Sequence, residues 1–243
     1  MRLDEEYCLS EYVDLGRLGD NEKVHIVRNQ VNGVIGVRKY VALDLEEIYL
    51  FLKENPNAYI PKIYECIQTD TNLIVIEEYL SGKNLEEMLK EKYFSEKDAA
   101  DIIICLCNAL YPLHHAKMPV ICKDLKAENV ILTNEGEVKL VDFDIARIYQ
   151  PGKSKDTVMM GTQGYAAPEQ FGFGQTDART DIYAMGVLLN YMLVREFPME
   201  KLTEGKFRTI VLKCIKINPE DRYQNVDELK ADICNAAEIP CSS

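Results

Sequence analysis

Several polar side chains interrupt the apolar runs in the middle of the chain, and four of them have types and spacing suited to chemistry. Asp124, Lys126 and Asn129 lie within ICKDLKAENVIL at residues 121–132, and Asp142 follows the next apolar run. Polar groups in such a setting must be hydrogen-bonded or charge-paired if they are buried. Carboxylate and amide oxygens can hold Mg²⁺, another carboxylate can orient a hydroxyl, and a cation can offset charge on a moving phosphoryl group. Taken singly, each Asp or Asn could equally be a turn residue.

These residues must be brought together by the elements around them. VILTNEGEVKLVDF at residues 130–143 predicts a hairpin with its turn at residues 134–136. Asp124 and Asn129 precede its first strand, and Asp142 ends its second strand. Because a hairpin folds those ends together, we expect the polar residues to converge at one edge.

The remaining patterns predict an α+β fold. Strands are expected at residues 23–29 and 34–41, a helix at 43–55, and a hairpin at 60–80 with its turn at 69–72. Further helices are expected at residues 85–92, 96–115, 181–194, 207–217 and 226–237. We therefore expect a two-lobed fold: a small antiparallel β-sheet lobe with one helix at residues 1–80, and a larger, mainly helical lobe at residues 81–243. A cleft is expected between the lobes, with the boundary near residues 80–83.

Composition narrows the class of protein. The 243 residues carry a formal net charge of -12, which argues against a nucleic-acid binder, because such a protein needs a basic surface. The start of the chain has no apolar core of signal-peptide length, and the most apolar segment, residues 182–194, is too short to span a bilayer. The eight cysteines lack zinc-ligand spacing. We expect reduced thiols, no membrane segment in this chain and a cytoplasmic location.

Six motifs in order resemble those of the eukaryotic-type protein kinase family. CKDLKAEN is similar to the catalytic-loop pattern HRDLKxxN, and DFD stands where the family has DFG. GTQGYAAPE, DIYAMG and PEDRY are similar to later family motifs, and KVHIVRNQVNGVIGVRKYV aligns with the strand-turn-strand that ends in the nucleotide lysine, Lys39. The segments AAPEQ and ARTDIYAMG resemble the corresponding segments of bacterial serine/threonine kinases. The resemblance covers almost the whole chain and implies the protein-kinase-like form of the two-lobed fold.

The resemblance implies roles for the central residues. Asp124 would be the catalytic base or hydroxyl-orienting group, and Lys126 would contact the γ-phosphate of ATP. Asn129 and Asp142 would bind Mg²⁺ or Mn²⁺, and Lys39 would hold the α- and β-phosphates.

Other residues would complete the nucleotide site. Glu47 is expected to position Lys39, with Glu46 as an open alternative. The backbone of Glu78, Tyr79 and Leu80 would meet the adenine. Glu77 falls at the position that guards the back of the nucleotide pocket, where an ionised carboxylate needs a partner or water.

The chain departs from the family at the phosphate-covering loop. LGRLGDNEKV at residues 15–24 has Gly16 and Gly19 but lacks the full three-glycine pattern before Val24. Asp20 and Glu22 would add negative charge near a polyanion, which predicts weak nucleotide affinity or a displaced loop.

Two further departures lie near the catalytic residues. Asp144 replaces the glycine of DFG and would restrict switching of Asp142 and Phe143 or add an oxygen near the metal. Cys122 and Lys123 replace His-Arg; the lysine keeps the positive charge that receives a phosphorylated activation segment but loses the arginine fork.

The segment after the DFD motif contains residues expected to act in regulation and at the substrate site. Thr157 and Ser154 are the candidate sites of autophosphorylation, whereas Thr162 is expected to touch Asp124 and Lys126. Glu169, Asp181 and Arg222 are interpreted as architectural: a buried ion pair and an anchor for the catalytic loop. His114 and His115 are interpreted as structural.

The sequence therefore indicates a serine/threonine protein kinase that uses Mg-ATP on an unidentified protein substrate. One alternative is a pseudokinase or scaffold with weak nucleotide binding, favoured by the glycine-poor loop and the DFD motif. The other is a small-molecule kinase, which GTQGYAAPE with Arg222 makes the weakest alternative.

Overall fold

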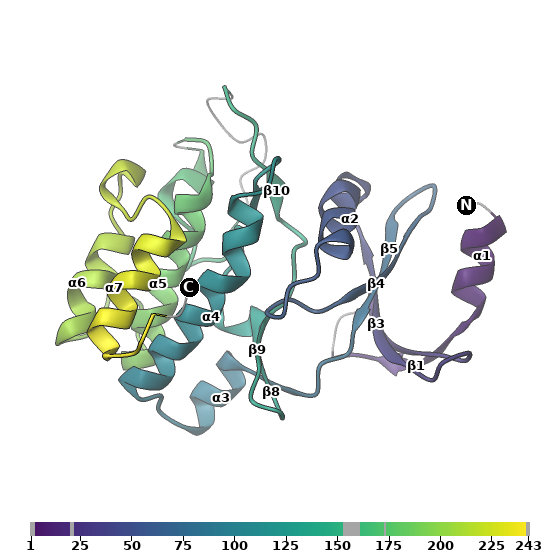
Figure 1. Cartoon of the computed structure of the whole chain (residues 1–243), viewed down its shortest axis with the longest axis horizontal. Coiled ribbons are helices and arrows are strands. Elements are labelled where there is room, and N and C mark those ends of the chain that lie inside the picture. Colours follow the sequence, from purple (N-terminus) through teal and green to yellow (C-terminus); the bar gives the residue numbers. More distant parts are fainter. Residues whose placement is uncertain (1–2, 20–21, 153–160, 173, 242–243) are drawn as a thin grey trace. The chain divides into compact units, whose positions relative to one another are not determined.

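The computed structural model describes residues 3–19, 22–152, 161–172 and 174–241. Ser154, Thr157 and Asp20, named above, lie outside the described residues. The chain divides into two compact units, Met1–Ser81 and Gly82–Ser243 (Figure 1).

A five-stranded antiparallel sheet forms the N-terminal unit. The strands are ordered β1-β2-β3-β5-β4, and their bounds are β1 Tyr12–Arg17, β2 Val24–Asn29, β3 Ile35–Val41, β4 Ile63–Gln68 and β5 Leu73–Glu78. β5 lies inside the sheet, and all but its last residue are buried, as expected for its continuous apolar run. β1 is one of the two edge strands and is exposed at five of its six positions.

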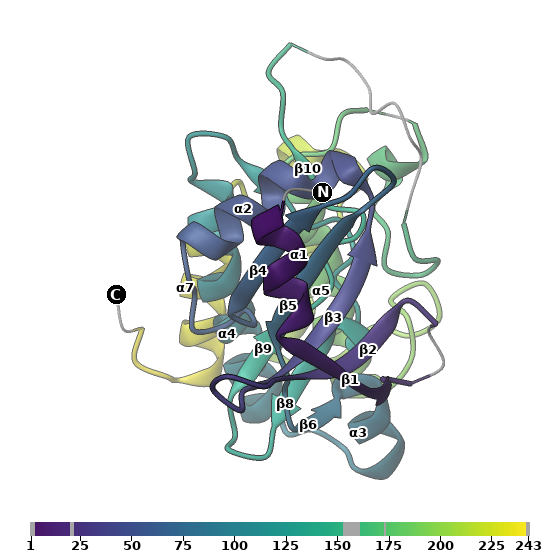
Figure 2. The same cartoon turned by 90° about the vertical axis from the view of Figure 1, so that its right-hand side faces the viewer.

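Two helices accompany this sheet. α2 (Glu46–Glu54) follows a short 3₁₀ turn at Leu43–Leu45, and its buried residues Ile48, Tyr49 and Leu52 recur at helical spacing. This helix packs against β4, whereas α1 (Leu3–Ser10) lies on the opposite face of the sheet (Figure 2). α1 and the exposed strand β1 were not expected from the sequence.

The C-terminal unit is mainly helical. Its helices are α3 Leu85–Glu91, α4 Glu96–His114, α5 Ala178–Val194, α6 Lys206–Cys214 and α7 Val226–Ala237. α4 packs against both α5 and α7, and α6 packs on α5 and α7. Three short strands form a sheet in the order β6-β8-β9, with bounds β6 Gly82–Asn84, β8 Val130–Thr133 and β9 Val138–Leu140. β7 (Val120–Ile121) pairs with β10 (Arg147–Ile148).

Local sequence signals explain where these helices begin. Capping boxes start α3 at Asn84 with Glu87 and α4 at Ser95 with Asp98. α5 begins at Ala178, three residues before the expected start at 181, because Asp177 caps it by accepting from Arg179 N. The expected helix at residues 207–217 instead ends at Cys214, followed by residues 215–218, which lead into Pro219.

α5 is the central helix of the unit. Gly186 permits its close approach to α6, because a Cβ at this position would lie 2.2 Å from the Cβ of Cys214. The buried amide of Asn190 is satisfied: Nδ2 donates to Glu196 O and Lys201 O, and Oδ1 accepts from Thr203 N, each at 2.8 Å. None of the helices within the described residues has the length and apolar character that crossing a membrane requires.

Candidate active site

Asp124 is the centre of a hydrogen-bonded group in the C-terminal unit. Its Oδ1 accepts from the hydroxyl of Thr162 at 2.7 Å, and its Oδ2 lies 2.8 Å from Lys126 Nζ. Lys126 Nζ also donates to Thr162 Oγ1 at 3.1 Å. The expected contact of Thr162 with both residues is therefore present. A carboxylate that accepts from a hydroxyl, with an ammonium beside it, can orient an attacking hydroxyl.

The amide of Asn129 has a defined orientation. Nδ2 donates to Asp124 O at 2.9 Å and to Asp124 Oδ2 at 3.0 Å, and this pattern assigns the nitrogen to the side that faces Asp124. Within the described residues, no hydrogen bond engages Oδ1. Asn129 itself is 6% exposed and is the last residue of the 3₁₀ turn Ala127–Asn129, which leads into β8.

Asp142 lies at the end of the hairpin strand opposite Asn129. β8 pairs with β9, with Val130 opposite Leu140, so the two strand ends lie side by side as expected. Asp142 Oδ1 accepts from Asp144 N at 3.1 Å, and the residue is only partly buried. Carboxylate and amide oxygens of this kind are the ligands Mg²⁺ prefers, so Asp142 and Asn129 fit a divalent metal. Within the described residues, no cluster of three or more His, Cys, Asp or Glu side chains could hold a metal by itself.

Two non-glycine residues near Asp124, one before β8 and one after β9, adopt a left-handed backbone conformation. Lys123 has φ 67° and Asp142 has φ 70°. Such conformations cost free energy and persist where the surrounding structure enforces them, often at functional sites. Asp144 does not have a positive φ. The position that the family fills with glycine therefore does not require a glycine in this conformation.

Asp181 anchors the catalytic loop from the first turn of α5. Its Oδ2 accepts from Cys122 N at 2.9 Å and its Oδ1 accepts from Lys123 N at 2.8 Å. His114 Nε2 lies 2.8 Å from the same Oδ2. Burial first, and then the charge of Asp181, raise the pKa of the Cys122 thiol well above its usual value. Asp124 and Asp142 also raise this pKa, so both carboxylates lie within electrostatic range of Cys122.

Lys123 shares a polar environment with a second cation. The lysine is 7% exposed, and its carbonyl accepts from Gln170 Nε2 at 3.0 Å. Burial and then the charge of Arg147 on β10 lower the pKa of Lys123, whereas Asp181 raises it. The charge of Arg147 therefore lies within electrostatic range of Lys123.

An aromatic group lies under the segment that carries Thr162. The rings of Tyr191 and Phe197 stack at 5.2 Å, and Tyr165 meets both edge-on. Gly164 has φ 91°, and a Cβ there would lie 2.8 Å from the Phe197 ring. The sequence alone does not indicate this aromatic support, because the support depends on a contact between α5 and residues distant in the chain.

In the N-terminal unit, Lys39 pairs with Glu77. Lys39 Nζ lies 2.5 Å from Glu77 Oε1, and Glu77 is 6% exposed. The expectation that a carboxylate at position 77 needs a partner is therefore confirmed. Glu47 is exposed on the first turn of α2 and Glu46 is half-buried. A role for either glutamate in positioning Lys39 stays a prediction.

The loop expected to cover phosphates joins β1 to β2. Leu18 N donates to Val24 O at 2.9 Å. Gly19 adopts a left-handed conformation with φ 68°, which favours glycine. Val24 is half-buried and lies opposite Lys39 in the β2–β3 register. Glu22 is exposed and pairs with Arg17 at 3.1 Å, so a cation partly offsets its charge.

The residues expected to meet adenine are Glu78, the last residue of β5, and Tyr79 and Leu80, which follow it. Glu78 N donates to Lys62 O at 2.8 Å, and Lys62 N donates to Glu78 Oε2 at 3.1 Å. Tyr79 is exposed and Leu80 is half-buried. Together with Gly19, Val24, Lys39 and Glu47, these residues belong to the N-terminal unit, whereas the catalytic-loop and metal-binding candidates belong to the C-terminal unit.

The fold and these sites define a protein kinase domain. Residues 28–237 match the family model described as the protein kinase domain. The chain therefore belongs to the protein kinase family, and the two-lobed α+β class expected from the sequence is confirmed.

Similar curated proteins include serine/threonine kinases of bacteria and of a plant. The chain is 31% identical over 192 residues to the probable serine/threonine-protein kinase PknB of Corynebacterium glutamicum, covering 65% of this chain and 29% of that protein. It is 28% identical over 272 residues to the serine/threonine-protein kinase PknB of Mycobacterium tuberculosis, covering 95% of this chain and 43% of that protein. An EPD1-interacting receptor-like cytoplasmic serine/threonine-protein kinase of Gossypium barbadense is 32% identical to the chain over 157 residues. The match covers 63% of this chain and 34% of that protein. The chain thus spans less than half the length of these relatives.

Proposed function

We propose that this domain transfers the γ-phosphoryl group of ATP to serine or threonine hydroxyls of a protein. The observation that carries the proposal is the contact of Asp124 with both a hydroxyl, that of Thr162, and the ammonium of Lys126. A network of this kind, in a chain that belongs to the protein kinase family, is suited to orienting an acceptor hydroxyl.

Asp124 would accept the hydrogen bond of the attacking hydroxyl. Its Oδ1 already accepts from one hydroxyl at 2.7 Å, and Asn129 Nδ2 holds the other oxygen. This hydrogen bond fixes the carboxylate, so that the acceptor oxygen can point toward the phosphorus. Lys126 would offset the negative charge that develops on the transferred group.

Asn129 and Asp142 would hold the divalent ion, Mg²⁺ or Mn²⁺. Asn129 presents Oδ1 because Nδ2 is engaged with Asp124, and Asp142 adds a carboxylate. When bound, the ion would neutralise charge on the nucleotide phosphates. Lys39 would contribute a further cation, with Gly19, Val24, Glu78 and Leu80 around the nucleotide.

Control by phosphorylation of this chain is part of the proposal. Lys123 and Arg147 supply two neighbouring cations, and Thr157 and Ser154 are the proposed acceptors. A phosphate group would be attracted to these cations. We also propose a cytoplasmic location, where thiols stay reduced.

Transfer of labelled γ-phosphate to the chain itself and to a generic basic protein tests the activity. The wild type is expected to incorporate label at saturating ATP with Mg²⁺ or Mn²⁺, whereas Asp124→Asn is not. Asp101→Asn, which changes an exposed carboxylate of α4, is the matched control for charge. Label in the wild type no higher than in Asp124→Asn would overturn the proposal.

A second measurement then identifies the pseudokinase alternative. Thermal unfolding with increasing Mg-ATP raises the melting temperature of any chain that binds nucleotide. Stabilisation without label incorporation would indicate a nucleotide-binding pseudokinase, and neither effect would indicate a scaffold.

A further inference from the structure

One partner of Lys39, Glu77, comes from the sheet itself. Directly paired residues place Val24, Lys39, Val75 and Cys66 in one row across β2, β3, β5 and β4. Glu77 lies two residues after Val75, and side chains two apart along a strand share a face. Lys39 and Glu77 are therefore diagonal neighbours on one face of the β3–β5 pair, within reach of a long side chain.

This ion pair is largely withdrawn from water. The side chains of Lys39 and Glu77 are 13% and 8% exposed, and Nζ and Oε1 are 2.5 Å apart. The residues directly opposite Glu77 are apolar: Val37 on β3 and Ile63 on β4. A buried carboxylate in such surroundings depends strongly on its cation, because removal of one partner leaves an uncompensated charge.

The glutamates of α2 differ from Glu77 in their surroundings. Glu47 is exposed, and the charge of Glu46 acts on the Cys66 thiol of β4. The sheet carries another ion pair with a helix residue, between Glu65 of β4 and Lys53 of α2 at 2.9 Å. That pair is about one-third exposed on both sides, with values of 32% and 37%. The Glu65–Lys53 pair therefore serves as a more exposed comparison for a glutamate-to-glutamine substitution in the buried Glu77–Lys39 pair.

We propose that Glu77 is a positioning residue for Lys39, fixing its ammonium on the sheet face so that it meets the nucleotide phosphates. The proposal rests on the proposed function, in which Lys39 binds ATP. An ammonium has three donor hydrogens, so a hydrogen bond to Glu77 leaves donors for phosphate oxygens. Because β3 and β5 are adjacent in the sheet, their hydrogen-bonded register places the two side chains on neighbouring strands.

The first test measures the reactivity of the Lys39 amine and needs no phosphotransfer. Wild type and Glu77→Gln are treated with acetic anhydride at several pH values, and modification is quantified residue by residue by mass spectrometry. Loss of the carboxylate removes the charge that stabilises the ammonium form, so Lys39 is expected to react several-fold faster in Glu77→Gln. Lys53 should react at its wild-type rate in this variant.

Two comparison variants sharpen this measurement. Glu65→Gln removes the partner of Lys53 and should leave the rate at Lys39 unchanged. Glu47→Gln should change the rate at Lys39 less than Glu77→Gln does. An unchanged Lys39 rate in Glu77→Gln, or a larger change in Glu47→Gln, would overturn the proposal whether or not the chain transfers phosphate.

The second test separates positioning from general loss of structure. In steady-state kinetics, Glu77→Gln is expected to lower kcat/KM for ATP on the order of tenfold or more, as a displaced positioning group does. The KM for the protein substrate should stay near that of the wild type. Glu77→Asp keeps the charge and should recover part of the loss. Equal losses in Glu77→Asp and Glu77→Gln, or a loss confined to the protein substrate, would contradict the positioning role.

If no variant and no wild-type sample transfers phosphate, the proposed function fails, and the amine-reactivity result still decides whether Glu77 holds Lys39.

Discussion

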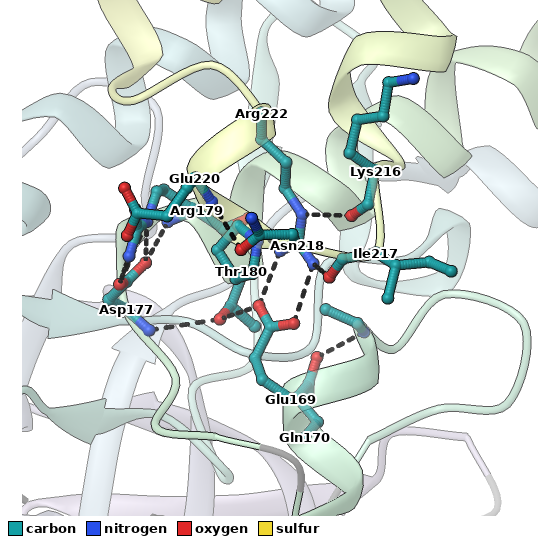
Figure 3. A network of polar contacts seen from close by, with 12 residues as sticks. Glu169, Gln170, Asp177, Arg179, Thr180, Lys216, Ile217, Asn218, Glu220 and Arg222 are labelled. Atoms are coloured by element: carbon teal, nitrogen blue, oxygen red, sulfur yellow. Dashed lines mark hydrogen bonds and ion pairs between the residues drawn. The ribbon is translucent and has the colours of Figure 1, made fainter. Parts of the chain in front are cut away.

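Arg222 and Glu169, 53 residues apart, form a doubly hydrogen-bonded ion pair inside the C-terminal unit. Figure 3 shows this pair within its network of polar contacts. The two contacts are 2.7 Å and 2.9 Å, and Arg222 and Glu169 are only 2% and 4% exposed. Thr180 adds a hydrogen bond to Glu169 at 2.9 Å, and Arg222 also donates to backbone carbonyls, including that of Arg179. The pair thereby ties the 3₁₀ turn Pro168–Phe171 to the start of α5 and to the 3₁₀ turn Pro219–Asp221.

Removing one partner of this ion pair should destabilise the unit strongly. Glu169→Gln leaves the buried guanidinium of Arg222 without a counter-charge, and such losses cost about 3–5 kcal/mol. Equilibrium unfolding in urea measures the change. Glu220→Gln is the control, because Glu220 pairs with Arg179 at 2.8 Å but is 71% exposed, and an exposed pair contributes about 1 kcal/mol or less. Equal changes in the two variants would contradict the architectural role of the buried pair.

The hydroxyl of Thr162 should matter for phosphotransfer more than for folding. Thr162→Val keeps the shape but removes the donor to Asp124 Oδ1 and the acceptor for Lys126. We expect kcat to fall about tenfold to a hundredfold, because the two charged groups lose a shared positioning contact. Thr162→Ser restores the hydroxyl and should recover most of the rate. If valine and serine variants have the same kcat, the hydroxyl has no part in the reaction.

Asp181 should control both the stability of the unit and its activity. In Asp181→Asn, an amide NH₂ replaces one oxygen that accepts from the backbone N–H of Cys122 or Lys123. Leaving a buried donor unsatisfied costs about 1–3 kcal/mol, and more when the lost acceptor was charged. Urea unfolding and label incorporation should therefore decline together, whereas Asp101→Asn should change neither. A fully active Asp181→Asn variant would show that the loop does not need this anchor.

Local patterns predicted most of the elements, and long-range pairing accounts for most of what was missed. Asp124, Asn129 and Asp142 lie beside one hairpin, so their convergence follows from short-range sequence. The partnership of Lys39 with Glu77 depends on the register between β3 and β5, which are separated by a helix and another strand. Strand β1 was not predicted, because its residues show no apolar alternation. It is an edge strand that is exposed at nearly all positions.

Replacing Asp144 of the DFD motif by glycine should not cause a large loss of stability. The residue with positive φ is Asp142, at 70°, and not Asp144, which is exposed. Asp144→Gly would therefore add freedom to the unfolded chain without relieving strain, and should lower stability by about 0.5–1 kcal/mol. Label incorporation should stay within a few-fold of the wild type. A large rise in activity would instead show that Asp144 restricts the motion of Asp142 and Phe143.

The half-buried thiol of Cys66 should make the N-terminal unit less stable at alkaline pH. Burial, followed by the charges of Glu65 and Glu46 against that of Lys53, raises the pKa of Cys66 to about 11 from an ordinary value of 9.0. The unfolded chain therefore releases this proton at a lower pH than the folded chain does. The stabilising contribution is complete below about pH 8.5, and is lost as the pH rises toward 11. Melting temperatures measured from pH 7 to pH 10.5 should fall less steeply above pH 9 in Cys66→Ala than in the wild type, because alanine cannot ionise. Parallel curves would show that Cys66 titrates alike in the folded and unfolded chains.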